Sequence, residues 1–255
     1  MKKVYLFGLI MGLALVGLTS CNDDEDQLTD SRLTNYAVLE LQGDEFMPVA
    51  LGSSFVDPGC KATLGGEDFT ANVQAIGASD VDPNTVGFYD ITYVATNPDG
   101  YQATASRTVC VYDPSVTLDM SGTYNVDMEA TLYGKPTGTR VTFANRAAYY
   151  GNTTQCTDIE FTKILPGVYA CNDLFGHWYN QIRGYGASYG SRYDMTGYVS
   201  LDNEGNIELL DSYVQGWGDG LDYIKNGKYD EAAGTVSYFM SYASAIYIDL
   251  VMNKQ

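Results

Sequence analysis

The sequence contains one histidine among its 255 residues, and its five cysteines lack the close spacing of zinc-binding motifs. No zinc site is therefore expected, and no other metal or cofactor is indicated. Basic residues are also scarce, since 14 Lys and Arg stand against 32 Asp and Glu, for a net charge of −18. Because no Lys/Arg cluster offers a surface for phosphates, nucleic acid and anionic substrates are excluded as ligands.

Long segments with helical periodicity, rich in Ala, Leu, Glu and Lys, are missing as well. In their place the chain has 22 tyrosines and 27 glycines with abundant Thr and Val, a composition that favours strands and tight turns. The hydrophobic content of 45% is sufficient for packed cores. The sequence therefore predicts an all-β protein of one large or two ordinary domains.

Residues 1–20 have the features of an export signal. Two lysines precede a mostly apolar stretch from Val4 to Val16, which is too short for a membrane-spanning helix of about 20 residues. Small residues precede Cys21, and the acidic run Asn22–Asp26 follows it. This pattern resembles the bacterial lipoprotein signal with the surface-export signal of Bacteroidota-type lipoproteins. The resemblance implies lipid attachment at Cys21 in the outer membrane, facing the exterior; an ordinary cleaved signal and a tether that faces the periplasm are the alternatives.

Changes in composition predict the organisation of the chain. Residues 21–36 are acidic and amide-rich, so they bury too little apolar surface to offset chain entropy and are expected to form a flexible tether. Short alternating apolar and polar segments then predict a first β domain at 37–113 and, after a linker at 114–118, an aromatic-rich β domain at 119–255. The second domain holds both tryptophans and most of the tyrosines.

The first β domain carries a series of motifs in a fixed order. They are Phe55-Val56-Asp57-Pro58-Gly59-Cys60-Lys61-Ala62, Val81-Asp82, Gly87-Phe88-Tyr89-Asp90-Ile91-Thr92-Tyr93, Asn97-Pro98-Asp99-Gly100 and Arg107-Thr108-Val109-Cys110-Val111. The Pro and Gly of Asn97–Gly100 suit a reverse turn, which predicts a hairpin between strands at 88–94 and 101–111. The series resembles the bacterial Ig-like module repeated in pesticidal crystal toxins and surface proteins. That resemblance implies a β-sandwich that acts as a spacer and has no active site.

The second domain has strand signals along most of its length. Strands are expected at 122–132, 158–164, 168–173, 195–201, 206–213, 236–242 and 246–252, with a short helix near 144–150. These antiparallel strands must bury their apolar face by closing into a barrel or by packing as a β-sandwich.

Five segments of this domain resemble the C-terminal domain of Bacteroidota surface lipoproteins. They are Ser121–Tyr124, Gly167–Tyr169 with Asp173–Tyr179, the Gly/Tyr run to Gly197, and Trp217-Gly218. The genes of those proteins tend to sit beside SusC/SusD-type glycan importers, so the resemblance implies a role in polysaccharide capture. It supplies no catalytic residues.

Aromatic residues spaced by glycines predict the ligand-binding site. Rings offer apolar faces that stack on the C–H face of a sugar, and nearby polar groups bond to its hydroxyls. The predicted site consists of Trp178, Tyr179, Tyr185, Tyr189 and Trp217, with Asn180, Arg183, Arg192 and Asp219 as polar partners. The alternative is that Trp178 and several of the tyrosines are core residues.

Catalytic patterns in this region are weak. Gly186-Ala187-Ser188-Tyr189-Gly190 matches the nucleophile motif of α/β-hydrolases, but His177 precedes Ser188, the wrong order for that triad, and no helix signal follows. Asp211, Asp219 and Asp222 are candidate carboxylates for glycoside hydrolysis, a mechanism decided by their separation in space. No catalytic residue is assigned, and the protein is not expected to be an enzyme.

The cysteines other than Cys21 divide between the two domains. An oxidising exterior permits two disulfides, and the division favours Cys60 with Cys110 and Cys156 with Cys171 among three possible connectivities. The alternative is buried free thiols that act as small apolar residues.

The predicted function is therefore that of a non-catalytic, lipid-anchored cell-surface protein. It would bind a polysaccharide or oligosaccharide for an uptake system, with the Ig-like domain as spacer. An interaction or assembly subunit of an outer-membrane transporter complex, with a SusC/SusD-type partner, is the alternative. A barrel that holds a small apolar ligand and a glycoside hydrolase are less favoured.

Overall fold

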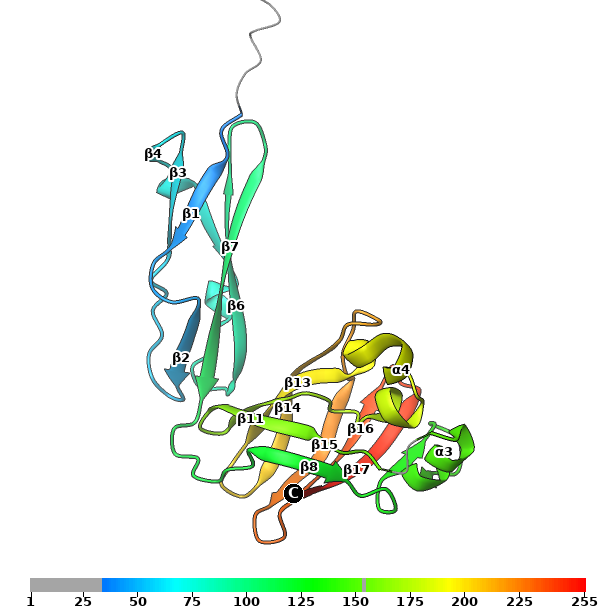
Figure 1. Ribbon diagram of the computed structural model, residues 1–255. Helices are drawn as coiled ribbons and strands as arrows, with labels where there is room; N and C mark the ends of the chain where they lie inside the picture. The colour runs from blue at the N-terminus through cyan, green and yellow to red at the C-terminus, as the bar shows by residue number, and fades with distance from the viewer. Residues whose placement is uncertain (1–33, 153–154) are drawn as a thin grey trace, which may run out of the picture.

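The computed structural model describes residues 34–152 and 155–255. They form two β domains arranged as an L, with the first standing as a column on one end of the second (Figure 1). None of the helices in these residues has the length and apolar character that crossing a membrane requires. The predicted lipid-attachment residue, Cys21, lies outside the described residues.

The first domain is the predicted Ig-like β-sandwich. One sheet has the strand order β1-β3-β4 and the other β2-β7-β6-β5, in which β2 pairs in parallel with β7. The elements are β1 (Ala37–Leu41), β2 (Phe46–Ala50), β3 (Cys60–Leu64), β4 (Glu67–Asp68), η1 (Thr70–Asn72), β5 (Val73–Ile76), η2 (Ala78–Asp80), β6 (Gly87–Thr96) and β7 (Gln102–Tyr112). Ile91, Val109 and Val111 are fully buried between the sheets, because alternate residues of β6 and β7 face inward.

A buried ion pair ties together three of the motifs that identify this module. Arg107 is 1% exposed, and its Nη1 lies 2.5 Å from Oδ1 of Asp57 and 3.1 Å from Oη of Tyr93. Tyr93 Oη also donates to Asp57 Oδ1 at 2.5 Å. Arg107 Nη2 and Nε donate to the carbonyls of Gln42 and Asp44 at 2.5 and 2.9 Å. One guanidinium therefore joins the loop after β1, the Asp57 turn and the β6–β7 hairpin.

The second domain is a closed antiparallel barrel, so of the two predicted alternatives the barrel is the one observed. Its ring runs β8-β11-β12-β13-β14-β15-β16-β17, and β17 pairs with β8 to close it. The strands are β8 (Gly122–Val126), β9 (Leu132–Gly134), β10 (Val141–Thr142), β11 (Ile159–Leu165), β12 (Val168–Cys171), β13 (Met195–Leu201), β14 (Asn206–Val214), β15 (Tyr223–Asp230), β16 (Thr235–Tyr242) and β17 (Ile246–Lys254). The β9–β10 hairpin extends along the other half of β17.

Short helices cover one end of the barrel. They are α3 (Phe143–Tyr150), the π-helical turn η3 (Trp178–Ile182), α4 (Gly186–Tyr189) and the 3-10 turn η4 (Gly190–Tyr193). Helix α3 begins where the Thr142 hydroxyl accepts a bond from Asn145 N, and it ends at Gly151, whose φ of 68° suits glycine. Its buried residue Phe143 faces Trp178, with ring centroids 5.4 Å apart.

The two domains contact each other through a ring pair and a clamped linker. Phe88 of β6 packs on Tyr198 of β13, with ring centroids 4.7 Å apart. The linker is held by Asn203 of the β13–β14 turn, whose Oδ1 accepts from Thr117 N at 2.9 Å and whose Nδ2 donates to Ser115 O at 3.0 Å. These contacts fix the column against the wall formed by β13 and β14.

Of the two alternatives for the cysteines, the structure has the buried free thiols: Cys60, Cys110, Cys156 and Cys171 form no disulfide with one another. Cys60 faces the sandwich core, whereas Cys110 alternates with the inward Val109 and Val111 and so points away from it. Cys156 and Cys171 both pack in the barrel core. Burial raises the pKa of the Cys110 thiol to about 11 and that of Cys156 to about 12, which keeps both thiols protonated.

Candidate functional site

The connection between β12 and β13, residues 172–194, covers the open end of the barrel and carries most of the predicted site. It begins and ends at strands that pair with each other, so both of its ends are fixed by the sheet. Between them lie η3, α4 and η4, which Figure 1 shows gathered above the barrel rim near the α4 label. The side chains of these turns are therefore presented on a rigid β scaffold.

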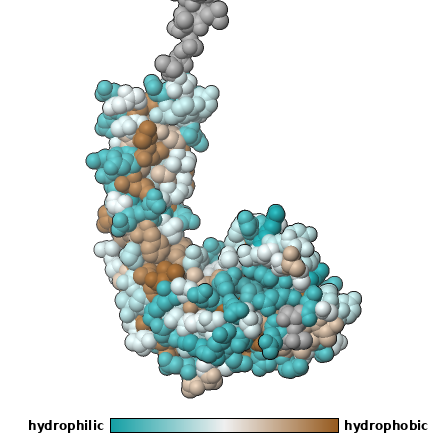
Figure 2. All heavy atoms as spheres, in the orientation of Figure 1, coloured by the Kyte–Doolittle hydropathy of each residue, from teal (hydrophilic) through white to brown (hydrophobic). Residues whose placement is uncertain are grey.

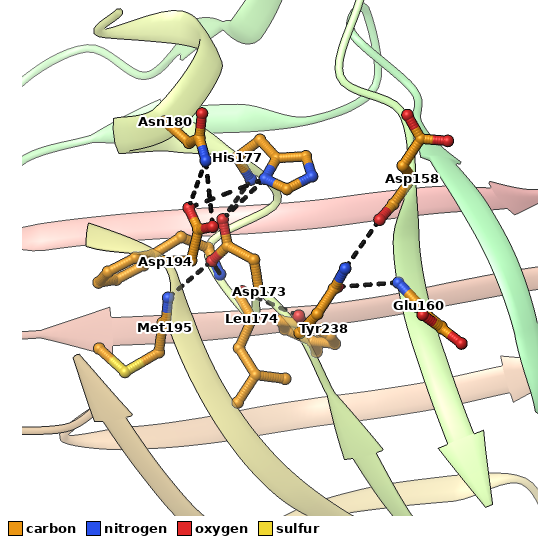
Figure 3. Close-up of polar contacts among 11 residues, drawn as sticks. Asp158, Glu160, Asp173, Leu174, His177, Asn180, Asp194, Met195 and Tyr238 are labelled. Atoms are coloured by element: carbon orange, nitrogen blue, oxygen red, sulfur yellow. Dashed lines mark hydrogen bonds and ion pairs between the residues drawn. The ribbon is translucent and has the colours of Figure 1, made fainter. Parts of the chain in front are cut away.

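The carboxylate of Asp173 holds the two ends of this connection together (Figure 3). Its Oδ1 accepts from the backbone N–H groups of Phe175 and Met195, each at 2.9 Å. Its Oδ2 accepts from His177 N at 3.0 Å and lies 3.1 Å from His177 Nδ1. Asp173 is 1% exposed, so each of these bonds satisfies a buried group that water does not reach.

His177 and Asp194 complete a buried group of three ionisable side chains. His177 Nδ1 lies 4.0 Å from Asp194 Oδ1, and Asn180 Nδ2 donates to both oxygens of Asp194 at 3.0 and 3.1 Å. The possible ligand atoms of Asp173, His177 and Asp194 all lie within 4.8 Å of one another. Since the oxygens of Asp173 already accept three backbone hydrogen bonds and contact His177 Nδ1, a metal would have to displace bonds that shape the loop. We assign this group a structural role.

The protonation of this group makes the stability of the barrel depend on pH. Burial, and then the charge of Asp173, raise the pKa of Asp194 to about 7. Burial alone would lower the pKa of His177, but its hydrogen bond to Asp173 and the charges of Asp173 and Asp194 raise it above its ordinary value. The folded protein thus binds more protons than the unfolded chain, and stability falls as pH rises through these pKa values. We expect the melting temperature of the barrel to decrease from pH 5 to pH 8.

Thermal unfolding followed by tryptophan fluorescence tests this pH dependence, because both tryptophans lie in the barrel. The Asp194→Asn variant should flatten the profile, whereas Asp211→Asn, which changes an exposed carboxylate of β14, should leave it as in the wild type. A melting temperature that rises between pH 5 and pH 8 in the wild type would contradict the assignment.

Six aromatic rings form a continuous cluster at this end of the barrel. Tyr185, Tyr189 and Tyr193 contact one another with centroids 5.2 to 5.9 Å apart. Trp217, from the loop after β14, contacts three other rings. Its centroid lies 4.5 Å from that of Tyr193, 4.6 Å from that of Tyr179 and 5.8 Å from that of Tyr242. We call Tyr185, Tyr189, Tyr193 and Trp217 the aromatic patch.

The aromatic patch reaches the surface through two of its members. Tyr189 is 54% exposed and Trp217 is 42% exposed, while Tyr185 and Tyr193 are half-buried beneath them. Gly216 allows this arrangement, since a Cβ there would clash with the Tyr193 ring. The loop is fixed by Gly216 N, which donates to Arg192 O at 2.8 Å. Two broad rings are thus held in place with their surfaces partly open to solvent.

Polar groups border the patch in the way a sugar site requires. The guanidinium of Arg183 lies over Tyr179 and Tyr185 and donates from Nη2 to Tyr185 Oη at 3.3 Å. Arg192 and Asp219 are exposed, and Asp219 Oδ1 accepts from Tyr242 Oη at 2.8 Å. These side chains can bond to hydroxyl groups of a ligand that rests on the rings.

Two of the predicted site residues are buried, and a third is half-buried and held by an internal hydrogen bond. Trp178 is 0% exposed and stacks on Tyr133 at 4.0 Å, because the large indole fills the space between η3, α3 and the barrel. Tyr179 is 5% exposed and supports Trp217 from below. Asn180 is engaged with Asp194. The prediction that Trp178 and Tyr179 contact ligand is therefore corrected: both are core residues.

Asp222 and the Ser188 motif, two of the candidates for catalysis, are engaged in contacts that hold the fold. Asp222 Oδ2 accepts from Ser241 Oγ and Ser244 N, both at 2.7 Å. Ser188 lies on the single turn α4, and the imidazole of His177 is directed at Asp173 instead.

The sequence prediction omits Tyr193 from the binding residues. The spacing of Tyr185, Tyr189 and Tyr193 at intervals of four, typical of one helical face, is the signal that points to it.

Two family models match the chain, one for each domain. Residues 39–111 match a bacterial surface protein Ig-like domain. Residues 113–254 match a family model described as a "-like, C-terminal domain". No curated protein matches. Neither match indicates a catalytic family, and the Ig-like match is to a module of bacterial surface proteins.

Two solved structures of domains of the Clostridium perfringens protein ZmpB match this chain with low TM-scores. One holds its M60 catalytic domain with CBM51-1 and CBM51-2, at 14% identity over 87% of this chain and 21% of that chain, with a TM-score of 0.27. The other holds CBM51-2 in complex with GlcNAc, with INT domains, at 17% identity over 86% of this chain and 44% of that chain, with a TM-score of 0.25. Scores this low support no inference.

The crystal structure of the lipoprotein BT2262 from Bacteroides thetaiotaomicron is 35% identical in sequence over 86% of this chain and 100% of that chain, with a TM-score of 0.44. Identity at this level over the full length of the relative, together with a family model that covers more than half of the chain, establishes the relationship. The protein belongs to the family of the Bacteroides lipoprotein BT2262 and carries a bacterial surface Ig-like domain followed by that family's C-terminal barrel.

Proposed function

We propose that the protein is a non-catalytic lipoprotein of the outer membrane, anchored through Cys21, that binds glycan outside the cell for a polysaccharide-uptake system. The observation that carries the proposal is the aromatic patch, in which Tyr189 and Trp217 are exposed while Tyr185 and Tyr193 support them. Partly exposed rings beside Arg192 and Asp219 suit the C–H faces and hydroxyls of sugars.

The Ig-like domain supports this proposal as a spacer. Its column stands on the barrel, and its first strand, β1, begins at the end of the column that is far from the barrel (Figure 1). A chain anchored upstream of Ala37 would therefore hold the barrel away from the membrane by the length of the column. A diacyl anchor gives stable attachment, which a single acyl chain does not.

Removing the rings of Tyr189 and Trp217 should strongly weaken glycan binding without unfolding the barrel. The variant Tyr189→Ala/Trp217→Ala loses the surfaces that contact sugar, and loss of such central aromatic residues weakens binding by about 30-fold or more. Affinity electrophoresis against soluble polysaccharides, followed by isothermal titration with those that retard the protein, measures the effect. Circular dichroism checks the fold.

A matched control comes from the Ig-like domain. Tyr36 and Tyr101 are also exposed tyrosines in ring contact, at 5.4 Å, but they lie far from the patch. The Tyr36→Ala/Tyr101→Ala variant should bind like the wild type. If the wild type binds no polysaccharide and instead co-purifies with an outer-membrane transporter, the protein is an assembly subunit and the glycan proposal fails.

A further inference from the structure

A groove crosses the outer wall of the barrel from the elbow between the domains to the aromatic patch. It consists of three hollows of about 390, 300 and 590 Å³, and each shares lining residues with the next. The first and second share Tyr198 and Asp211, and the second and third share Asn172, Thr196 and Tyr213. Figure 2 shows the elbow as a recess between the column and the barrel.

A β-bulge on β14 determines which side chains of this strand face the groove. Opposite Tyr198 and Val199 of β13 stand Asp211 and Leu209, so the register shifts at Leu210. The extra residue puts Asp211 and Tyr213 on the outer face, while Leu209 packs inward against the core. On β13 the alternation places Thr196 and Tyr198 outward beside them. The outer wall thus carries two exposed rings, Tyr198 at 38% and Tyr213 at 51% exposure.

The groove joins the aromatic patch at its far end. Its third hollow is lined by Ser191, which belongs to η4, and by Gln215, two residues before Trp217. The bond from Gly216 N to Arg192 O holds these two segments side by side. Along β13 the stretch from Asp194 to Tyr198 alone spans about 13 Å at the usual strand rise. Groove and patch therefore form one path that is longer than a single sugar ring.

The lining of the groove is acidic and uncharged polar. In the described part of the chain, five carboxylates line the three hollows, and neither lysine nor arginine does so. Four of them, Glu45, Asp90, Glu160 and Asp211, are exposed, and the fifth, Asp194, belongs to the buried group with Asp173 and His177. Carboxylate and amide oxygens accept hydrogen bonds from sugar hydroxyls, whereas a uronate or sulfate group would be repelled at such short range.

We propose that the groove continues the glycan site as a track for an extended, non-anionic polysaccharide chain, which runs from the aromatic patch to the elbow at Phe88. This inference rests on the proposed function and adds the class of ligand to it. Tyr213 and Tyr198 contact the sugars along the track, and Asp211 accepts bonds from their hydroxyls. The Ig-like domain forms one end of the track and is then part of the binding surface.

Binding as a function of chain length tests the track. The probes are xyloglucan, galactomannan and mixed-linkage β-glucan, each with its disaccharides and longer oligosaccharides, and polygalacturonate and chondroitin sulfate as anionic chains. The groove variant is Tyr213→Ala/Asp211→Asn, the patch variant is Tyr189→Ala/Trp217→Ala, and the control is Tyr101→Ala/Glu129→Gln, which changes exposed residues elsewhere.

We expect the groove variant to bind the polymers and longer oligosaccharides about 10-fold more weakly and to bind disaccharides like the wild type. The patch variant should lose binding to the long chains and to the disaccharides. The anionic chains should not bind to any of the proteins. If the groove variant matches the wild type on polymers while the patch variant fails, the track is refuted and the proposed function stands. Groove-dependent binding of an anionic chain refutes the stated ligand class. Absence of binding to any chain refutes both proposals.

Discussion

Replacing Arg107 with methionine should destabilise the Ig-like domain by about 3–5 kcal/mol, because it removes one partner of a buried ion pair and leaves the other uncompensated. Asp57 would lose its cation, and the carbonyls of Gln42 and Asp44 would lose their donors. Methionine keeps most of the apolar stem of arginine, so the effect reports the lost polar contacts. For a domain of this size the loss is a large fraction of the total stability.

The two domains can be followed separately in this experiment. The Ig-like domain contains no tryptophan, so tryptophan fluorescence reports the barrel, while far-ultraviolet circular dichroism reports both domains. In urea, Arg107→Met should lower the midpoint of the transition seen only by dichroism. Lys61→Met, which removes an exposed cation of β3, serves as the control. An Ig-like transition unchanged within 1 kcal/mol, roughly the scale of a surface ion pair, would show that the buried pair is energetically unimportant.

Replacing Trp178 with alanine should cost the barrel about 3–5 kcal/mol, the range for removing a large buried aromatic side chain. The indole is 0% exposed and contacts Tyr133, Phe143 and Tyr150, so its loss leaves a cavity between α3, η3 and the barrel wall. The fluorescence of Trp217 still reports unfolding in this variant. The matched Trp217→Ala variant, monitored by the fluorescence of Trp178, should cost clearly less, about 1–2 kcal/mol, because Trp217 is 42% exposed but still packs on Tyr179 and Tyr193.

This pair of variants separates two roles that the sequence prediction merged. If Trp178→Ala unfolds at the same urea concentration as the wild type, the indole is not a core residue in solution. If Trp217→Ala costs as much as Trp178→Ala, the aromatic patch is a structural cluster rather than a free surface. The glycan proposal then loses its support.

Most of the fold could be predicted from the sequence, because the signals that indicate strands are local. The predicted strand at 195–201 coincides with β13, and the predicted helix near 144–150 corresponds to α3. The strand β15 was not predicted, because its sequence Tyr223–Asp230 is polar and its alternation is broken where Asn226 adopts a φ of 53°. A barrel and a sandwich impose the same alternation on each strand, so only the pairing of β17 with β8 distinguishes them.

The site could be predicted less well, because the burial of an aromatic ring depends on residues that are distant in the sequence. Trp178 and Trp217 are the same residue type near glycines, yet only Trp178 meets α3 and the β9 hairpin. A local clue existed, since Trp178 lies in a run with Leu174, Phe175 and Ile182, all fully buried. The groove could not be predicted at all, because it depends on a one-residue bulge and on the angle between the domains.

The closure of the barrel by β17 has a kinetic consequence. Met252 pairs with Val126, so the ring is complete only when segments more than a hundred residues apart have met. The central hairpin of the Ig-like domain, in contrast, joins β6 and β7 across a short turn. Since distant pairing carries a larger loop-closure entropy, the barrel should be the slower folder of the two. While it remains open, its unpaired strand edges are exposed to aggregation, and a chain that crosses a membrane before folding will need to be shielded during that interval.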